Sequence, residues 1–290
     1  MKSGFVNIFG KPNAGKSTLL NGLLGEKLAI VSSKVQTTRH RIKGFLNEKD
    51  QYQIIFSDTP GIIEPKYKLH QRMMASVKSA MEDADVGILL LDIQEDWNEA
   101  AELFASLHLK VPCIVALNKI DKAEKETVNK AKEFFAAQPY CKKVVTLSAL
   151  NQKIFTSLIQ AIVALLPEGM PFYDEDEITD LPVKFFVGEL IREKIYTLFG
   201  DEIPYHSAVL VNTFKEKSSL VKIQADIIVQ RETQKMILIG EKGKMIKQIG
   251  TLARVDIEKF LEQKVFLELF IKVRPKWRES DAQLKEYGYN

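Results

Sequence analysis

Cysteine is scarce in this 290-residue chain, which contains only Cys113 and Cys141. Two cysteines, one of them inside an apolar strand-like run, do not make a disulfide framework, and this usage fits a reducing compartment. Long apolar runs are also missing, because stretches such as VGILLLDI are far shorter than the roughly 20 residues that span a membrane. The first residues enter a strand-like run rather than an apolar leader. We therefore expect a cytoplasmic protein.

The chain also lacks a strong charge of either sign. Its formal net charge is +3, so overall charge predicts no nucleic-acid partner, and any such site must come from local clustering. With 46% hydrophobic residues, the chain can bury a sizeable core. Its length favours two domains.

Short apolar runs alternate with helix-like segments through the first half of the chain, which is typical of a doubly wound parallel sheet. The runs cover residues 5–9, 53–56, 86–91, 113–117 and 144–147. The stretch IKGFLNEKDQYQIIF breaks this rhythm, because a polar turn separates two alternating runs. We predict a hairpin there, which adds one antiparallel edge strand.

A change of composition marks a boundary after the first half. Residues 168–182 contain prolines and an acidic run, so we predict a solvated linker between domains at 1–167 and 183–290. Beyond it we expect a helix near 183–199 and strands near 207–213 and 221–229. A further strand is expected directly before the sequence GEKG.

The sequence GKPNAGKS, residues 10–17, follows an apolar strand-like run and precedes a helix-like one. Two glycines let backbone N–H groups surround phosphate oxygens, and the following helix directs its positive end at them. In this G-x-x-x-x-G-K-S pattern, Lys16 reaches the β and γ phosphates and the Ser17 hydroxyl coordinates Mg²⁺.

Two further motifs end later strands of the same sheet, where such a ligand binds. SDTPG places Asp58 to hold Mg²⁺ through water and the Gly61 N–H to meet a γ-phosphate. LNKID places Asp121 to accept hydrogen bonds from guanine N1–H and its exocyclic amine, which selects guanine over adenine. Asn118 is expected to tie the loops together, and the Ala149 N–H in SAL to reach guanine O6.

The polar segment SSKVQTTRHRIKG lies between the first helix and the hairpin, and we place a second magnesium hydroxyl at Thr38. An ordinary basic surface loop is the alternative. Ile62 follows D-x-x-G where Ras-like enzymes have a water-orienting Gln, and an alkyl side chain cannot orient water. Asn13 either supports a K⁺ ion that supplies positive charge or only caps its loop.

Charge clusters near the C-terminus. From residue 240 to residue 278, ten Lys or Arg face five Asp or Glu, a local excess larger than that of the whole chain. GEKG within ILIGEKGKMIKQI has the G-x-x-G spacing with which a KH domain approaches a nucleic-acid backbone. The alternative is a structural helix start with solvated lysines. Trp277, among basic residues, either stacks on a base or packs.

These motifs in this order resemble the translation-factor-like GTPases, and QTTRHRIKG with DTPG resembles the Era family. That resemblance implies a Ras-like GTPase domain followed by a type II KH domain. It further implies a GTPase that assists assembly of the small ribosomal subunit by binding its RNA near the 3′ end. We expect a monomer, and peripheral association with an anionic membrane surface at the inner face of the cell membrane is a second expectation.

The predicted site residues form four groups. The nucleotide ligands are Gly10, Lys11, Pro12, Asn13, Ala14, Gly15, Lys16, Ser17, Thr18, Asp58, Thr59, Pro60, Gly61, Asn118, Lys119, Asp121, Ser148, Ala149 and Leu150. Catalysis is assigned to Lys16, Thr38 and Gly61, and Mg²⁺ to Ser17, Thr38 and Asp58. RNA is assigned to Gly240, Glu241, Lys242, Gly243, Lys244, Lys247, Arg274, Lys276 and Arg278. Two rival functions remain: an RNA-binding protein without significant hydrolysis, and a GTPase whose basic domain binds protein or membrane.

Overall fold

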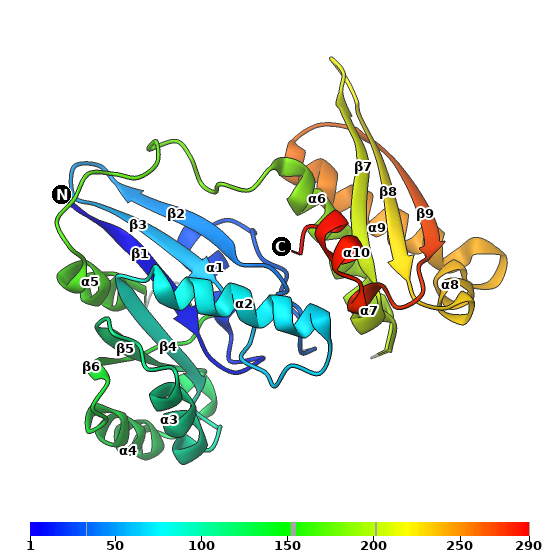
Figure 1. Ribbon diagram of the computed structural model, residues 1–290. Helices are drawn as coiled ribbons and strands as arrows, with labels where there is room; N and C mark the ends of the chain where they lie inside the picture. The colour runs from blue at the N-terminus through cyan, green and yellow to red at the C-terminus, as the bar shows by residue number, and fades with distance from the viewer. Residues whose placement is uncertain (33, 152–154, 201, 290) are drawn as a thin grey trace. The chain divides into compact units, whose positions relative to one another are not determined.

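The computed structural model describes residues 1–32, 34–151, 155–200 and 202–289 (Figure 1). The chain forms two compact units. The first comprises Met1–Glu64 and Met73–Asp180, and the second comprises Pro65–Arg72 and Leu181–Asn290. Within the described ranges, no helix is long and apolar enough to cross a membrane.

The first unit is built on a six-stranded sheet with the order β2-β3-β1-β4-β5-β6. Its strands are β1 (Lys2–Phe9), β2 (Ile42–Glu48), β3 (Tyr52–Asp58), β4 (Val86–Asp92), β5 (Cys113–Asn118) and β6 (Cys141–Thr146). Only β2 pairs antiparallel, with β3, and the other pairs are parallel. The predicted sheet and its antiparallel edge strand are therefore confirmed. The loops that follow β1, β3 and β5 leave the sheet at the same edge, because these strands run in one direction.

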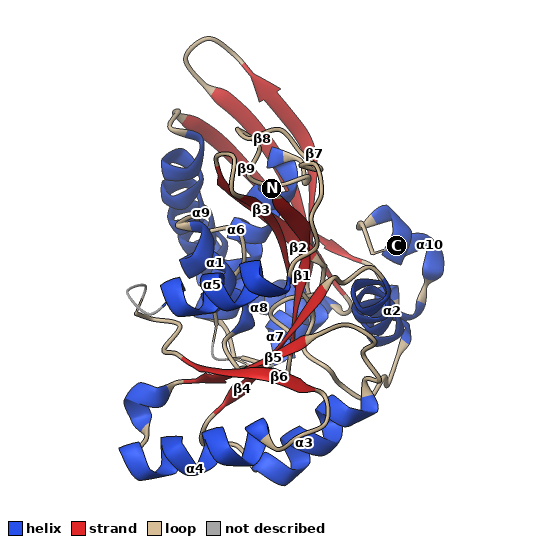
Figure 2. Ribbon diagram, turned by 90° about the vertical axis from the view of Figure 1, so that its left-hand side faces the viewer, coloured by secondary structure: helices blue, strands red, loops and turns tan. Residues whose placement is uncertain are grey.

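Helices cover both faces of this sheet (Figure 2). One face carries α1 (Lys16–Leu24) and α5 (Phe155–Leu165), and the other carries α2 (Lys68–Glu82), α3 (Trp97–Ser106) and α4 (Lys125–Ala136). A short 3-10 helix, η1 (Ile120–Lys122), follows β5. The second face buries one apolar cluster in which Phe9, Leu89 and Val115 of the strands meet Phe104 and Phe135 of the helices.

Residues 168–180 are mostly exposed, but they are bonded along the first unit. The Phe45 N–H donates to the Ile178 carbonyl at 3.0 Å, and the Thr179 hydroxyl donates to the Lys43 carbonyl at 2.7 Å. The ring of Tyr173 stacks on Phe45 with centroids 3.9 Å apart. Because β2 is an edge strand with free backbone groups, the predicted linker supplies the partners that this edge would otherwise take from another chain.

The second unit has a three-stranded sheet, with β8 (Val221–Val229) between β7 (Ala208–Glu216) and β9 (Val265–Val273). Its helices are α6 (Val183–Leu198), α7 (Glu202–His206), α8 (Glu232–Ile239), α9 (Lys244–Leu261) and α10 (Asp281–Glu286), with 3-10 turns η3 (Glu241–Gly243) and η4 (Trp277–Glu279). The order of a leading helix, two strands, two helices and a third strand is the predicted type II KH arrangement. The strand expected before GEKG was wrong, because those residues form α8.

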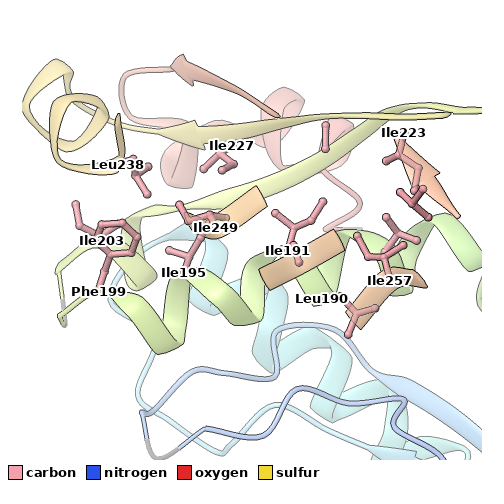
Figure 3. Packing of buried hydrophobic residues seen from close by; sticks show 14 of the residues in the cluster. Leu190, Ile191, Ile195, Phe199, Ile203, Ile223, Ile227, Leu238, Ile249 and Ile257 are labelled. Carbon is pink, nitrogen blue, oxygen red and sulfur yellow. The ribbon is translucent and has the colours of Figure 1, made fainter. Parts of the chain in front are cut away.

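One apolar cluster holds this unit together (Figure 3). Alternate residues of β8, namely Ile223, Ala225 and Ile227, face Ile191 of α6 and Ile249 of α9, and all five are fully buried. The period of two along the strand and of three to four along the helices gives each element one apolar side. The opposite side of the three strands is not covered by helices of this cluster, although Asp226 and Ile228 of β8 are buried there as well.

Candidate functional site

The two glycines of the first loop are required by close backbone contacts. Gly10 has φ +156°, and a Cβ there would lie 2.2 Å from the carbonyl oxygen of Leu90. Gly15 has φ +102°, and a Cβ there would lie 2.3 Å from Nδ2 of Asn118. A side chain at either position would displace the loop. Glycine is therefore required at both positions by contacts within the protein as well as by the approach of a phosphate.

Lys16 is buried and points into its own loop. Its Nζ donates to the carbonyl oxygens of Gly10 at 3.1 Å and Lys11 at 2.9 Å. Burial lowers the pKa of Lys16 to about 8, although the charges of Asp58 and Glu95 act in the opposite direction. A doubly anionic phosphate would replace the two carbonyls as a stronger partner and raise that pKa again.

The three predicted magnesium ligands meet at one point. The Ser17 hydroxyl donates to Asp58 Oδ2 at 2.6 Å and lies 2.8 Å from the Thr38 hydroxyl, which is 3.1 Å from the same carboxylate oxygen. Burial raises the pKa of the Asp58 carboxyl, against the lowering effects of Lys16 and the two hydroxyls. The other oxygen, Oδ1, is buried and has no hydrogen-bond partner among the described residues. A buried carboxylate with an unsatisfied oxygen suits a cation or its bound water.

Asn118 joins three loops, as predicted from its motif. Its Nδ2 donates to the Ala14 carbonyl at 2.7 Å, and its Oδ1 accepts from the backbone N–H groups of Lys119 at 2.8 Å and Ala149 at 2.9 Å. The side chain is completely buried. The Ala149 N–H, predicted to meet guanine O6, is therefore directed at Asn118 in this structure.

Lys119 and Asp121 lie on the base side of the loop. Lys119 Nζ forms an ion pair with Asp92 at 2.7 Å and donates to the Asn13 carbonyl at 2.9 Å. The Lys119 side chain therefore extends to the phosphate loop. Asp121 is exposed, and its hydrogen bond with the side chain of Ser148 holds the pKa of its carboxyl below the usual value. The ionised carboxylate is ready to accept two donors.

A cavity of about 400 Å³ lies over these loops, a size within the usual range for small-molecule sites. Pro12, Asn13, Lys16, Gly61 and Lys119 line it among the predicted residues. Sequence reasoning missed much of its opposite wall, because hydrophobic and small polar side chains in a loop carry no distinguishing pattern. These residues are Ile30, Val31, Ser32, Lys34, Gln36 and Thr37.

The remaining predicted residues have mixed roles. A Cβ on Gly61 would lie 2.9 Å from the backbone nitrogen of Pro12, so a glycine allows this loop to approach the phosphate loop. Thr59 donates its hydroxyl to the Ile8 carbonyl at 2.7 Å, which anchors the loop from below. Ile62 is partly buried against the apolar cluster of α2, α3 and α4. Leu150 is 82% exposed.

In the second unit, GEKG forms a tight turn between α8 and α9. Gly240, Lys242 and Gly243 all have positive φ, at 69°, 50° and 79°. A Cβ on Gly240 would lie 2.5 Å from Cγ of Met245, whereas Gly243 has open space beside it. Lys242, Lys244 and the rest of the predicted loop charges are exposed. The turn therefore presents backbone and positive charge together.

A groove of about 450 Å³ adjoins α9. Leu267 and Leu269 of β9 and Ile246 of α9 supply apolar lining, and Lys247 and Arg254 supply charge. This combination suits bases on the apolar surface and phosphates at the charged side chains. Arg254 was not among the predicted residues, although it follows Lys247 by seven residues, or about two helical turns of α9.

The basic tail divides into exposed and buried residues. Arg274 and Lys276 are exposed, and Arg278 is half-buried. Trp277 is fully buried, donates its Nε1–H to the His206 carbonyl at 3.0 Å and packs beside Tyr287. Of the two alternatives for Trp277, packing is correct and base stacking is wrong, because no face of the ring reaches solvent.

Two protein-family models match different parts of this chain. The model described as a 50S ribosome-binding GTPase matches residues 5–119, and the KH domain model matches residues 202–278.

Curated relatives and solved structures match over the whole length. GTPase Era of Clostridium kluyveri is 42% identical over 100% of this chain and 99% of its own, and GTPase Era of Geotalea uraniireducens is 44% identical over 99% and 98%. A crystal structure of a variant of Aquifex aeolicus Era bound to GDP and AlF4⁻ has a TM-score of 0.94 at 41% identity, covering 100% of this chain and 99% of that one. A structure of Era in complex with MgGDPNP and nucleotides 1506–1542 of 16S ribosomal RNA matches with the same values. This chain is a member of the Era family of GTPases.

Proposed function

We propose that this chain is a GTP-hydrolysing switch that binds the 3′-terminal region of small-subunit ribosomal RNA and assists assembly of that subunit. The observation that carries the proposal is the presence, in one chain, of the Ser17–Thr38–Asp58 cluster beside a nucleotide-sized cavity and of a KH loop beside a basic groove. The solved Era relative holds MgGDPNP and nucleotides 1506–1542 of 16S RNA, which supports the choice of subunit. The matching family description names the large subunit instead, so the RNA experiment below includes both.

The nucleotide site fits Mg²⁺. Two hydroxyls and a carboxylate with one unsatisfied oxygen form a hard oxygen donor set, and the ion takes its remaining ligands from phosphate and water. When bound, Mg²⁺ supplies positive charge to the β and γ phosphates. Lys16 adds a second positive charge, and the Gly61 N–H orients the γ-phosphate.

Hydrolysis transfers the γ-phosphoryl group to water. Ile62 packs into the apolar cluster and offers the water no hydrogen bond, so orientation falls to backbone groups near Gly61. Asn13 lines the cavity. Its backbone is in the left-handed conformation, with φ 66°. A K⁺ ion held beside Asn13 would supply the positive charge that an arginine supplies in other GTPases.

The RNA site extends from the GEKG turn into the groove beside α9. Lys242 and Lys244 neutralise phosphates, and unpaired bases enter the apolar part formed with β9. Trp277 has no part in this site. We assign the domains to residues 1–167 and 183–290, with residues 168–182 connecting them.

That connection offers a path between the two sites. The loop that contains Thr38 continues directly into β2, and residues 178–180 are hydrogen-bonded or ion-paired to Lys43 and Phe45 on that strand. Leu181 then begins the second unit. A change in the Thr38 loop on loss of the γ-phosphate therefore acts on the segment that leads to the KH domain.

The RNA assignment is tested with Lys242→Asp, because Asp tolerates the positive φ of this residue and reverses its charge. Lys217→Asp, on an exposed lysine of the β7–β8 turn, is the matched control. Anisotropy titrations at fixed salt would use RNA of the 16S 3′ region, a scrambled sequence, a 23S fragment and anionic vesicles. We expect Lys242→Asp alone to weaken 16S binding at least about tenfold with GTP affinity unchanged. Equal binding of all RNAs, or stronger binding of vesicles, would contradict the proposal.

A further inference from the structure

The face of the second sheet opposite its apolar core carries two exposed phenylalanines on β9. The odd-numbered residues of the strand, including Leu267 and Leu269, pack against the core cluster. Phe266 and Phe270 point the other way and remain 47% and 48% exposed. Figure 1 shows this sheet with α9 behind it. Two aromatic rings exposed on one face of one strand form an apolar surface of the kind that marks interaction sites.

The strand register places charged and polar side chains around these rings. Lys222 of β8 lies opposite Phe266, and its Nζ is 5.7 Å from the centre of that ring. Gln224 lies opposite Glu268, and Asp226 lies opposite Phe270. We call Lys222, Gln224, Phe266, Glu268, Phe270 and Lys272 the aromatic platform.

The carboxylates in the platform and directly beside it are paired. Glu268 is 3.4 Å from Lys222 Nζ and accepts a hydrogen bond from Gln224 at 2.8 Å. Asp226 is nearly buried and lies 2.6 Å from Lys272 Nζ. Because each carboxylate is matched by a lysine, the surface between the two rings does not strongly repel a phosphate backbone.

The platform and the proposed RNA groove lie on the two faces of β9. Leu267 and Leu269 line that groove, and Phe266 and Phe270 are their neighbours on the reverse side of the same strand. β9 is an edge strand of its sheet, so a nucleic-acid strand that leaves the groove reaches the reverse side around this single strand. The two rings are about 13 Å apart along the strand, which leaves room for bases to stack on each.

We propose that the aromatic platform is a second RNA subsite, on which bases of a single strand that leaves the KH groove stack on Phe266 and Phe270. The proposal rests on the RNA-binding function proposed above. Aromatic side chains on a sheet surface with lysines beside them bind single strands by stacking, which tolerates any base. The side chains of Lys222 and Lys272 are 40% and 47% exposed although each is paired with a carboxylate, so both can also contact phosphates.

Titrations with RNA of two lengths test the subsite separately from the groove. A short RNA of about four nucleotides matches the length that a KH loop clamps, and an unstructured RNA of about 16 nucleotides extends beyond it. We expect wild type to bind the longer RNA more tightly. The Phe266→Ala/Phe270→Ala variant should lose that gain, about fivefold or more for each ring, and keep its affinity for the short RNA.

Further variants separate stacking from apolar docking. Phe270→Trp should retain the gain, and Phe270→Leu should lose it, because leucine keeps apolar area without a ring. Phe172→Ala is the matched control, since Phe172 is 56% exposed and belongs to the first unit. Crosslinking at 254 nm followed by peptide mapping should recover β9 peptides linked to the longer RNA.

Several outcomes would overturn the subsite. Equal length dependence in wild type and the double alanine variant would do so, as would full retention by Phe270→Leu. A double variant that changes self-association or protein binding but not RNA binding would assign the platform to a protein. Failure of wild type to bind either RNA would instead refute the proposed RNA function, so the two failures are distinguishable. Melting temperatures of all variants identify any loss of folding.

Discussion

Replacement of Asn118 by alanine should disconnect the nucleotide site with little change elsewhere. The Asn118 side chain holds the Ala14 carbonyl and the N–H groups of Lys119 and Ala149 through three hydrogen bonds of 2.7 to 2.9 Å. These groups belong to the phosphate loop, the base loop and the loop after β6. Alanine can replace none of the three bonds.

The magnitude follows from the three groups left without a partner. Each buried polar group without a hydrogen bond costs about 1–3 kcal/mol, and water that enters the cavity keeps the cost near the lower end. The sum is about 3 kcal/mol, or roughly 150-fold in affinity, because about 1.4 kcal/mol corresponds to tenfold. This free energy is lost mainly from nucleotide binding, because the three loops can relax in the free protein but must return to their native arrangement to bind the nucleotide.

Asn21→Ala is a control with the same chemistry. Asn21 also donates once and accepts twice, to the Ala29 carbonyl and from the N–H groups of Leu28 and Ala29. It should lower the melting temperature with a much smaller effect on nucleotide affinity. Titration of a fluorescent GDP analogue would measure both variants. A dissociation constant for Asn118→Ala within about threefold of wild type, or equal losses in the two variants, would refute the role of Asn118.

Four other predictions concern the same site. Asp121→Asn should weaken GTP binding by about 3 kcal/mol, because two charged hydrogen bonds are lost. It should improve binding of xanthosine triphosphate, because the new amide donates to xanthine O2. Competition between the two triphosphates measures this, and an unchanged preference would remove Asp121 from the base site. Ile62→Ala should leave the rate of single-turnover hydrolysis nearly unchanged, since the alkyl side chain orients no water. Hydrolysis by the wild type should be faster in K⁺ than in Na⁺ if Asn13 supports a K⁺ ion, and equal rates in both salts would reject that role. Lys16 binds phosphate as a cation, and its pKa in the free protein is about 8. Nucleotide affinity should therefore be constant below pH 8 and fall up to about tenfold per pH unit above it. Calorimetry at several pH values tests this slope, and a constant affinity from pH 7 to 9 would show that Lys16 stays protonated.

Local sequence patterns predicted the first unit well because its constraints are local. The glycines of the phosphate loop, the strand ends at Asp58 and Asn118 and the polar turn of the hairpin each follow from steric or hydrogen-bonding needs within a few residues. Parallel strands then bring these ends to one edge. The meeting of Ser17, Thr38 and Asp58 could therefore be predicted without knowledge of any long-range packing.

The features that sequence patterns predicted wrongly or missed depend on contacts between residues far apart in the chain. The run MILI before GEKG is too short for its period to distinguish strand from helix, and its packing against α9 makes it α8. The acidic segment 168–182 is mostly exposed, as its composition suggests, but composition alone could not predict that its backbone also bonds to the edge strand β2. Trp277 lies among charges in the sequence, and only the tertiary fold shows that Tyr287 and the His206 carbonyl enclose it.

The central claim is that one chain couples the γ-phosphate of GTP to RNA affinity. It is tested most directly by the dissociation constant for RNA of the 16S 3′ region, measured at fixed salt with saturating GDP and with saturating non-hydrolysable GTP analogue. Coupling between two such sites is typically about 1–3 kcal/mol, so the two constants should differ by roughly 5- to 150-fold, and RNA should change GTP affinity by the same factor. Equal constants within about twofold would contradict the account and leave two independent modules.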